Sequence, residues 1–105
     1  MIFEKYSSTL KKYLNNLGYK VEYLGGNFFY SIEGYNNAGS NELFQIYEKI
    51  KCVRYIEEND NFWLCVKEYD YVSLNKLYIL AKKHLIKAKE QKIKNKMNEL
   101  EKDFE

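Results

Sequence analysis

The amino-acid sequence predicts an α+β protein in which helices pack on a four-stranded antiparallel sheet. Two observations favour this class. Two similar aromatic segments, NFFYSIEGY at residues 27–35 and NFWLCVKEY at residues 61–69, each complete a pattern typical of a β-hairpin. Apolar residues at helical spacing lie before, between and after these hairpins. A chain of 105 residues has the size of one domain.

The two hairpins belong to a longer internal similarity. Residues 18–51 align with residues 52–85 without a gap. The matching pairs include Asn27/Asn61, Phe28/Phe62, Tyr35/Tyr69 and Phe29/Trp63. Because each copy has a hairpin pattern followed by a helical one, we expect an internal ββα repeat and the element order α-ββ-α-ββ-α.

The first repeat and the helix before it have clear local signals. The apolar positions of the first helix are Phe3, Tyr6, Leu10, Tyr13, Leu14 and Leu17, and Gly18 ends it. In the first hairpin, Gly25-Gly26 supply the positive φ angles that a two-residue turn requires. Ser40 is a suitable N-cap for a helix over NELFQIYEKIK, residues 41–51, whose apolar positions have helical spacing.

The second repeat leads into a long C-terminal helix. Its hairpin pairs CVRYIE with NFWLCVKEY around a turn at Asn59-Asp60. The last helix is expected to begin near Ser73. We therefore predict a single α+β domain over residues 1–88 and a charged extension of the C-terminal helix over residues 89–105.

One face of the predicted sheet has a mixed composition, because successive side chains of a strand point to opposite faces. Phe29 and Trp63 share this face with the basic residues Lys20, Arg54 and Lys67. Three interpretations are open. A third helix covers the rings, or the rings and Arg54 contact a protein partner, or the rings stack on the bases of single-stranded nucleic acid.

The last helix carries most of the positive charge. Residues 82–96 contain seven lysines and one acidic residue, Glu90, which gives a net charge of +6. These lysines either keep the helix solvated or bind phosphates without sequence preference. The same helix has an apolar stripe typical of half a coiled-coil seam, formed by Val72, Ile79, Ile86, Ile93 and Leu100, with Met97 and Phe104. A homodimer through this stripe is a further interpretation.

No pattern typical of catalysis, of metal binding or of cofactor binding is present. His84, the single histidine, lies among lysines and is expected to face solvent. Cys52 and Cys65 are expected to be free thiols in a reducing, cytoplasmic setting. MIFEKYSS lacks the apolar stretch of a secretory signal, and no apolar run has the length of a membrane span. We expect a non-enzymatic protein without a metal or a cofactor.

Together these observations predict a small binding protein that acts as an inhibitor or adaptor of a protein partner. The expected partner-binding residues are Phe29, Arg54, Trp63, Lys67, Tyr35, Tyr69 and Tyr71. Lys, Asn, Ile and Tyr have AT-rich codons and dominate the sequence. This composition favours a phage or mobile-element protein that blocks a host defence, as anti-CRISPR proteins do. The alternative is a nucleic-acid-binding module, with site residues Lys20, Arg54, Lys82, Lys83, Lys87 and Lys89.

Overall fold

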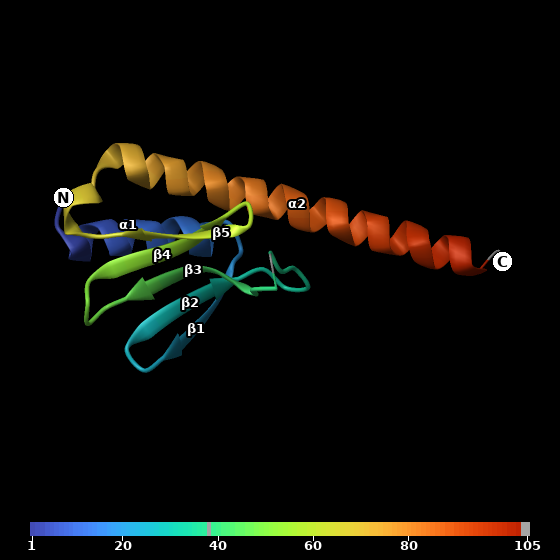
Figure 1. The fold of residues 1–105 in the computed structure, drawn as a ribbon, viewed down its shortest axis with the longest axis horizontal. Helices are drawn as coiled ribbons and strands as arrows, with labels where there is room; N and C mark the ends of the chain where they lie inside the picture. The colour runs from blue at the N-terminus through green and yellow to red at the C-terminus, as the bar shows by residue number, and fades with distance from the viewer. Residues whose placement is uncertain (38, 104–105) are drawn as a thin grey trace.

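The computed structural model describes residues 1–37 and 39–103 and has an α+β fold (Figure 1). One helix comes first, five strands follow, and a 3-10 turn leads into a second, long helix. The elements are α1 (Phe3–Asn16), β1 (Lys20–Leu24), β2 (Asn27–Ser31), β3 (Glu42–Tyr47), β4 (Cys52–Glu57), β5 (Asp60–Leu64), η1 (Val66–Glu68) and α2 (Tyr71–Asp103).

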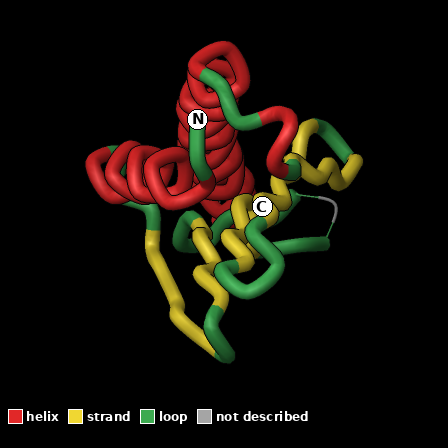
Figure 2. Tube along the Cα trace, turned by 90° about the vertical axis from the view of Figure 1, so that its left-hand side faces the viewer, coloured by secondary structure: helices red, strands yellow, loops and turns green. Residues whose placement is uncertain are grey.

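The five strands form one antiparallel meander in the order β1-β2-β3-β4-β5. Both helices lie on the same side of this sheet (Figures 1 and 2). We call the side that carries them the inner face and the other side the outer face. Within the described part of the chain, no helix covers the outer face.

A single core lies between the helices and the inner face. Its buried residues include Phe3, Tyr6, Leu10 and Leu14 of α1, Tyr30, Phe44, Ile46, Val53 and Tyr55 of the sheet, and Leu74, Leu77, Leu80 and Ala81 of α2. The buried Tyr19 hydroxyl donates to the carbonyl of Ala81 at 2.8 Å, which ties the start of the sheet to α2. Burying these apolar surfaces is the main favourable contribution to folding.

Two helices do not cover all five strands. At ~4.8 Å per strand the sheet is about 24 Å wide, whereas two helices of ~10 Å cover about 20 Å. The uncovered part is the β1–β2 hairpin, which extends past α1 at the bottom of Figure 1. Val21 and Tyr23 point to the inner face and are nevertheless exposed. The inner face is therefore buried at its centre and exposed at its β1 edge.

The predicted helix over residues 41–51 is wrong, because this segment forms the central strand β3 and the turn that follows it. Phe44 and Ile46 point to the inner face and Gln45 points to the outer face, while Leu43 lies at a β-bulge and packs in the core. All four side chains are buried. Ser40 caps no helix, and its hydroxyl donates to the carbonyl of Glu42. The sheet therefore has five strands and not four, and the structure does not confirm the ββα repeat.

Both predicted hairpins are confirmed. Leu24 pairs with Asn27 across Gly25-Gly26, whose φ angles are 62° and 83°. Glu57 pairs with Asp60, so the second turn consists of Glu58 and Asn59, one residue earlier than predicted. Strand β5 ends at Leu64 and not at Tyr69.

Helix α2 begins slightly before the predicted position. It starts at Tyr71, because the Asp70 carboxylate accepts a hydrogen bond from the Ser73 N–H at 2.7 Å. Its side chains are exposed from Lys89 to Asn98, where the helix extends beyond the sheet (Figure 1). The side chain of Leu100 and the whole of Phe104 lie outside the described residues. Neither described helix has the length and apolar character that crossing a bilayer requires.

Candidate interaction surface

A row of five side chains crosses the outer face, one from each strand. The strand register aligns Glu22, Phe29, Gln45, Arg54 and Trp63. Side chains that occupy such a row on one face contact their neighbours across the strands. The strand pairing therefore brings together Phe29, Arg54 and Trp63, which are far apart in the sequence.

Tyr47 joins this row from the next position of β3 on the same face. Its ring lies 6.4 Å from the Phe29 ring at an interplanar angle of 87°, and 5.3 Å from the Trp63 ring at 30°. Such edge-on and offset arrangements are the favourable ones for aromatic pairs. We call Phe29, Tyr47, Arg54 and Trp63 the aromatic platform.

Gln45 lies at the centre of the platform and is only 4% exposed. Its side-chain oxygen accepts hydrogen bonds from Arg54 Nη1 at 3.2 Å and from the Tyr47 hydroxyl. Its side-chain nitrogen donates to Glu42 Oε2 at 2.6 Å. Because both ends of this buried amide are satisfied, it holds Arg54 and Tyr47 in fixed positions at little cost in desolvation.

Arg54, the single arginine of the sequence, is held on its other side by Asn61. Its Nε and Nη2 donate to Asn61 Oδ1 at 3.2 and 2.8 Å, and its guanidinium carbon lies 5.9 Å from the Trp63 ring centroid. These partners are neutral, and no ion pair of the described residues includes Arg54. The positive charge is positioned without being neutralised by a carboxylate.

The platform is open to solvent at its β5 end. Trp63 is 49% exposed, while Phe29, Tyr47 and Arg54 are partly exposed. Next to Phe29 the outer face has a hollow of about 350 Å³, whose walls include Lys20, Glu22 and Glu42. The surface therefore offers flat aromatic area with charges of both signs around it.

The other predicted partner-binding residues lie elsewhere. Lys67 is exposed but lines a hollow between β5 and α2, on the helix side of the molecule. Tyr71 is exposed at the first turn of α2. Tyr35 and Tyr69 are only 7% and 3% exposed, so their rings are not available to a partner.

Tyr69 has a structural role in the core. It packs against Tyr6 at 4.5 Å and against Phe3 at 5.7 Å between ring centroids. Its hydroxyl is shared between the carbonyls of Lys51 at 2.6 Å and Leu64 at 3.2 Å, and burial raises the pKa of this hydroxyl. Tyr69 therefore holds together the ends of β4 and β5.

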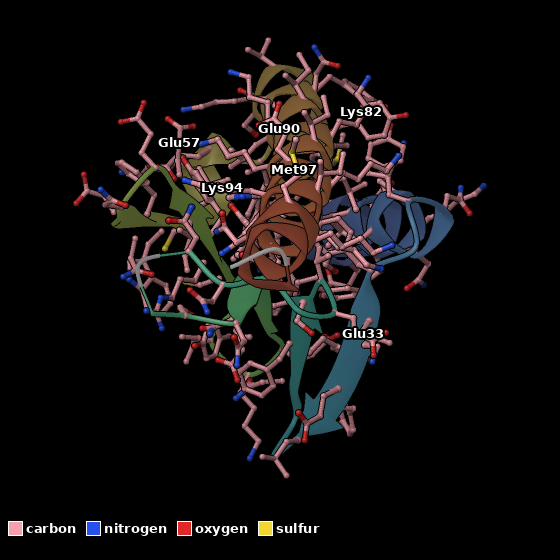
Figure 3. All side chains as sticks on the ribbon, turned by 90° about the vertical axis from the view of Figure 1, so that its right-hand side faces the viewer. Glu33, Glu57, Lys82, Glu90, Lys94 and Met97 are labelled. Carbon is pink, nitrogen blue, oxygen red and sulfur yellow. The ribbon has the colours of Figure 1, made fainter. Side chains whose placement is uncertain are left out.

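Of the five lysines of the nucleic-acid alternative, Lys20 borders the platform on the outer face, whereas the other four lie elsewhere. Lys20 lies on β1 and pairs with Glu33 at 3.3 Å. The others, Lys82, Lys83, Lys87 and Lys89, lie on α2, on the opposite side of the sheet from the platform. They also spread around the helix, because Lys82 projects away from Glu57 in Figure 3 whereas Lys83 and Lys87 lie near it.

His84 is buried, contrary to the expectation that it faces solvent. It is 1% exposed, and its ring lies 6.0 Å from the rings of Tyr35 and Phe44. Nε2 lies 2.8 Å from the carbonyl of Ile56. Because a carbonyl only accepts, Nε2 carries the proton, and Nδ1 has no hydrogen-bond partner among the described residues. Burial lowers the pKa of His84 and keeps the ring neutral at pH 7.

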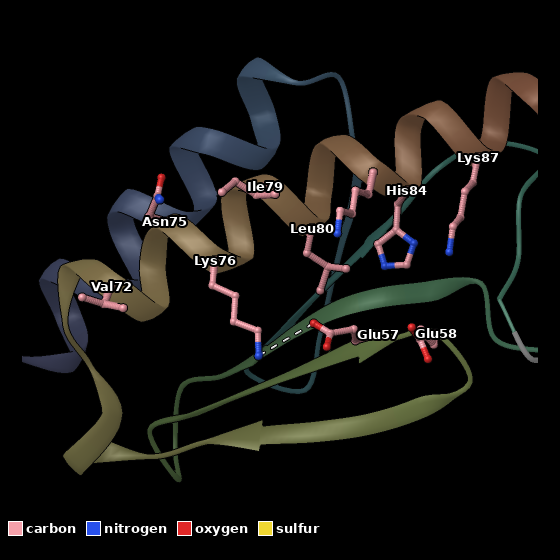
Figure 4. Close-up of a pocket in the computed structure, with 10 residues that line it drawn as sticks. Glu57, Glu58, Val72, Asn75, Lys76, Ile79, Leu80, His84 and Lys87 are labelled. Carbon is pink, nitrogen blue, oxygen red and sulfur yellow. Dashed lines mark ion pairs between the residues drawn. The ribbon is translucent and has the colours of Figure 1, made fainter.

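A cavity of about 530 Å³ lies beside His84, between α2 and the β4–β5 turn (Figure 4). Its charged walls are Glu57, Glu58, Lys76, Lys83 and Lys87, and Lys76 pairs with Glu57 at 3.8 Å. The negative charges of the two glutamates therefore largely compensate the positive charges of the three lysines in this cavity. The described residues contain no group of three His, Cys, Asp or Glu side chains placed to hold a metal ion.

Comparison of the chain with protein-family models, with curated proteins and with solved structures finds no match.

Proposed function

We propose that this chain is a non-enzymatic binding protein that contacts a protein partner through the aromatic platform. The observation that supports this proposal most strongly is the arrangement of Phe29, Tyr47, Arg54 and Trp63 on a sheet face that no described helix covers. Large aromatic residues and arginine are the residue types that contribute most to protein interfaces.

Preorganisation favours binding by this surface. Arg54 and Tyr47 are already held by Gln45, so little side-chain entropy is lost when a partner covers them. The guanidinium has no carboxylate partner of its own within the described ion pairs and remains available to an acidic side chain. A carboxylate next to Trp63 would gain a charge-assisted hydrogen bond from Arg54.

The charge around the platform favours a protein over a nucleic acid. Arg54 and Lys20 are accompanied by Glu22 and Glu42 on the same face, so the surface has no positive track for a phosphate backbone. Because the residues that dominate the sequence have AT-rich codons, the favoured partner is a host-defence enzyme. The chain would inhibit this enzyme, as anti-CRISPR proteins do.

The test begins with identification of the partner. The tagged chain is used to isolate proteins from host-cell lysate, and the protein recovered is then purified and titrated with the wild-type chain. Trp63→Ala and Arg54→Ala each remove one platform side chain, and a loss of about 2 kcal/mol or more in binding free energy is expected, because Trp and Arg are the residue types that dominate binding energy at interfaces. Tyr71→Ala is the matched control, because Tyr71 is also an exposed aromatic but lies on α2.

The expected result is that the platform variants lose the purified partner while Tyr71→Ala retains it. All variants are checked by circular dichroism for the wild-type fold. If folded Trp63→Ala binds the partner as tightly as wild type, the platform is not the interface.

Nucleic-acid binding is a second candidate, and it rests on α2. The helix exposes its side chains from Lys89 to Asn98, where lysines lie on several sides. Oligonucleotide binding that weakens steeply with salt, and that is lost when Lys83, Lys87 and Lys89 are replaced by Gln, would support this candidate. Under the protein-partner proposal the chain shows no such salt-sensitive binding of the same oligonucleotides.

A further inference from the structure

The two cysteines of the chain lie side by side at the edge of the aromatic platform. Cys52 is the first residue of β4, and Cys65 directly follows β5. Their sulfur atoms are 2.9 Å apart. This separation is shorter than ordinary contact between two sulfur atoms, so no side-chain reorientation is needed to bring the thiols together.

The strand register explains this proximity. Val53 pairs with Leu64 and Arg54 with Trp63, which places Cys52 opposite Cys65 at the next position of the antiparallel ladder. Directly opposed residues in such a ladder have Cα atoms about 4.5 or 5.5 Å apart. Both separations lie within the range of about 4.4–6.8 Å that a disulfide bridges.

Neighbouring groups fix the positions of both thiols. The Tyr69 hydroxyl binds the carbonyls of Lys51 and Leu64, the residues immediately before Cys52 and Cys65. The N–H of Cys65 donates to Glu68 Oε2 at 3.1 Å, and its carbonyl accepts from the N–H of Glu68 at 2.8 Å. The thiols are therefore preorganised, which raises their effective concentration toward each other.

We propose that Cys52 and Cys65 form a reversible disulfide across β4 and β5, with a low-molecular-weight disulfide such as oxidised glutathione as the oxidant. The exposed Cys65 is the first nucleophile. Its thiolate attacks one sulfur of the oxidant, forms a mixed disulfide and releases one small thiolate, which takes up a proton. Cys52 then loses its proton, attacks the Cys65 sulfur and displaces a second small thiol. Two protein thiols are oxidised, and one small disulfide is reduced to two thiols.

The order of the two cysteines follows from their surroundings. Cys52 is half-buried, and burial together with the hydrogen bond to Cys65 raises its pKa to about 11. A thiol with a raised pKa reacts slowly with an external disulfide, because only the thiolate is nucleophilic. It still completes the internal step, since its target sulfur is already adjacent.

The bond would join the two strands that carry Arg54 and Trp63. Cys52 lies directly across from Tyr47 in the β3–β4 pairing, so the sulfur atoms border the platform. This disulfide depends on the two cysteines alone and would form whether or not the platform binds a protein.

In the test, the reduced, folded chain is incubated in a glutathione redox buffer. The remaining free thiols are then alkylated with iodoacetamide, and the mass of the intact chain is measured. The expected product is a monomer that has lost two hydrogen atoms and takes up no alkyl group. Cys52→Ser should instead accumulate one glutathionyl group at Cys65. Cys65→Ser should react more slowly, because the remaining Cys52 is half-buried. A wild-type chain that ends with two alkylated thiols, or with glutathione on either cysteine and no internal bond, would overturn the proposal.

Tyr69→Phe tests the role of the neighbouring hydroxyl and keeps the ring in the core. Losing one hydrogen bond of ordinary strength should lower the equilibrium constant for the internal disulfide by about two- to tenfold. Tyr71→Phe, which changes an exposed tyrosine nearby, should leave that constant unchanged. Equal constants for Tyr69→Phe and wild type would show that the thiols need no such support.

Discussion

The buried His84 makes a specific prediction about stability and pH. Its folded-state pKa is lowered, chiefly by burial, so the unfolded chain takes up a proton more readily than the folded one. Burial and Lys87 both oppose protonation, and together they outweigh the Ile56 carbonyl and Glu57, which favour it. The free energy of unfolding should therefore fall as the pH is lowered through the unfolded-state value of about 6.5.

The magnitude follows from proton linkage. For one group that stays neutral in the folded state, stability changes by at most about 1.4 kcal/mol per pH unit below the unfolded-state pKa. Between pH 7.5 and 5.5 the expected loss is therefore up to about 1.4 kcal/mol. Carboxylates contribute little in this window, because their unperturbed pKa values lie near 4.

The assay is urea unfolding at pH 7.5 and 5.5, followed by circular dichroism, for wild type and for His84→Leu. The variant removes the titrating ring and leaves the Ile56 carbonyl without its donor, which should cost about 1–3 kcal/mol at pH 7.5. It should then lose less stability than wild type between the two pH values. The same loss of stability in both proteins would show that His84 is not the group responsible.

Three further outcomes are expected. Phe44→Ala removes a fully buried ring from the central strand and should cost about 3–5 kcal/mol in urea unfolding, whereas a change within about 0.5 kcal/mol would show that the ring is not in the core. Oxidation of Cys52 and Cys65 closes a loop of 14 residues and should raise the free energy of unfolding by up to about 3 kcal/mol over that of the reduced chain. Removal of the residues after Ala88 should give a folded monomer if the exposed apolar stripe of α2 forms a homodimer, and light scattering of both chains decides this.

The sequence determined the elements whose signals are local. Gly25-Gly26 favours a tight turn, because glycine tolerates the positive φ angles that both residues adopt here. The apolar spacing of α1 and its stop at Gly18 are likewise confirmed. The alternation along β2, β4 and β5 was sufficient to place Phe29, Arg54 and Trp63 on one face.

The central strand β3 was not predictable from local pattern. Two apolar residues, Leu43 and Phe44, stand next to each other at a β-bulge, and this interrupts the alternation of apolar and polar residues that marks a half-exposed strand. Its apolar spacing fits a helix equally well. This segment forms a strand because it pairs with β2 on one side and with β4 on the other, and these pairings are tertiary contacts. For this reason the sequence pattern did not reveal Tyr47 of the platform or Gln45, which supports it.

The tertiary structure also decided what each side chain faces. His84 belongs to a lysine-rich helix, and only the position of α2 on the sheet buries its ring. Tyr69 follows a hairpin in the sequence, yet it fills the core beside α1. With one helix fewer than predicted, both helices are needed on the inner face, and the outer face with its aromatic platform remains open. Local sequence specifies the elements, whereas competition for burial among all of them specifies which surfaces remain exposed.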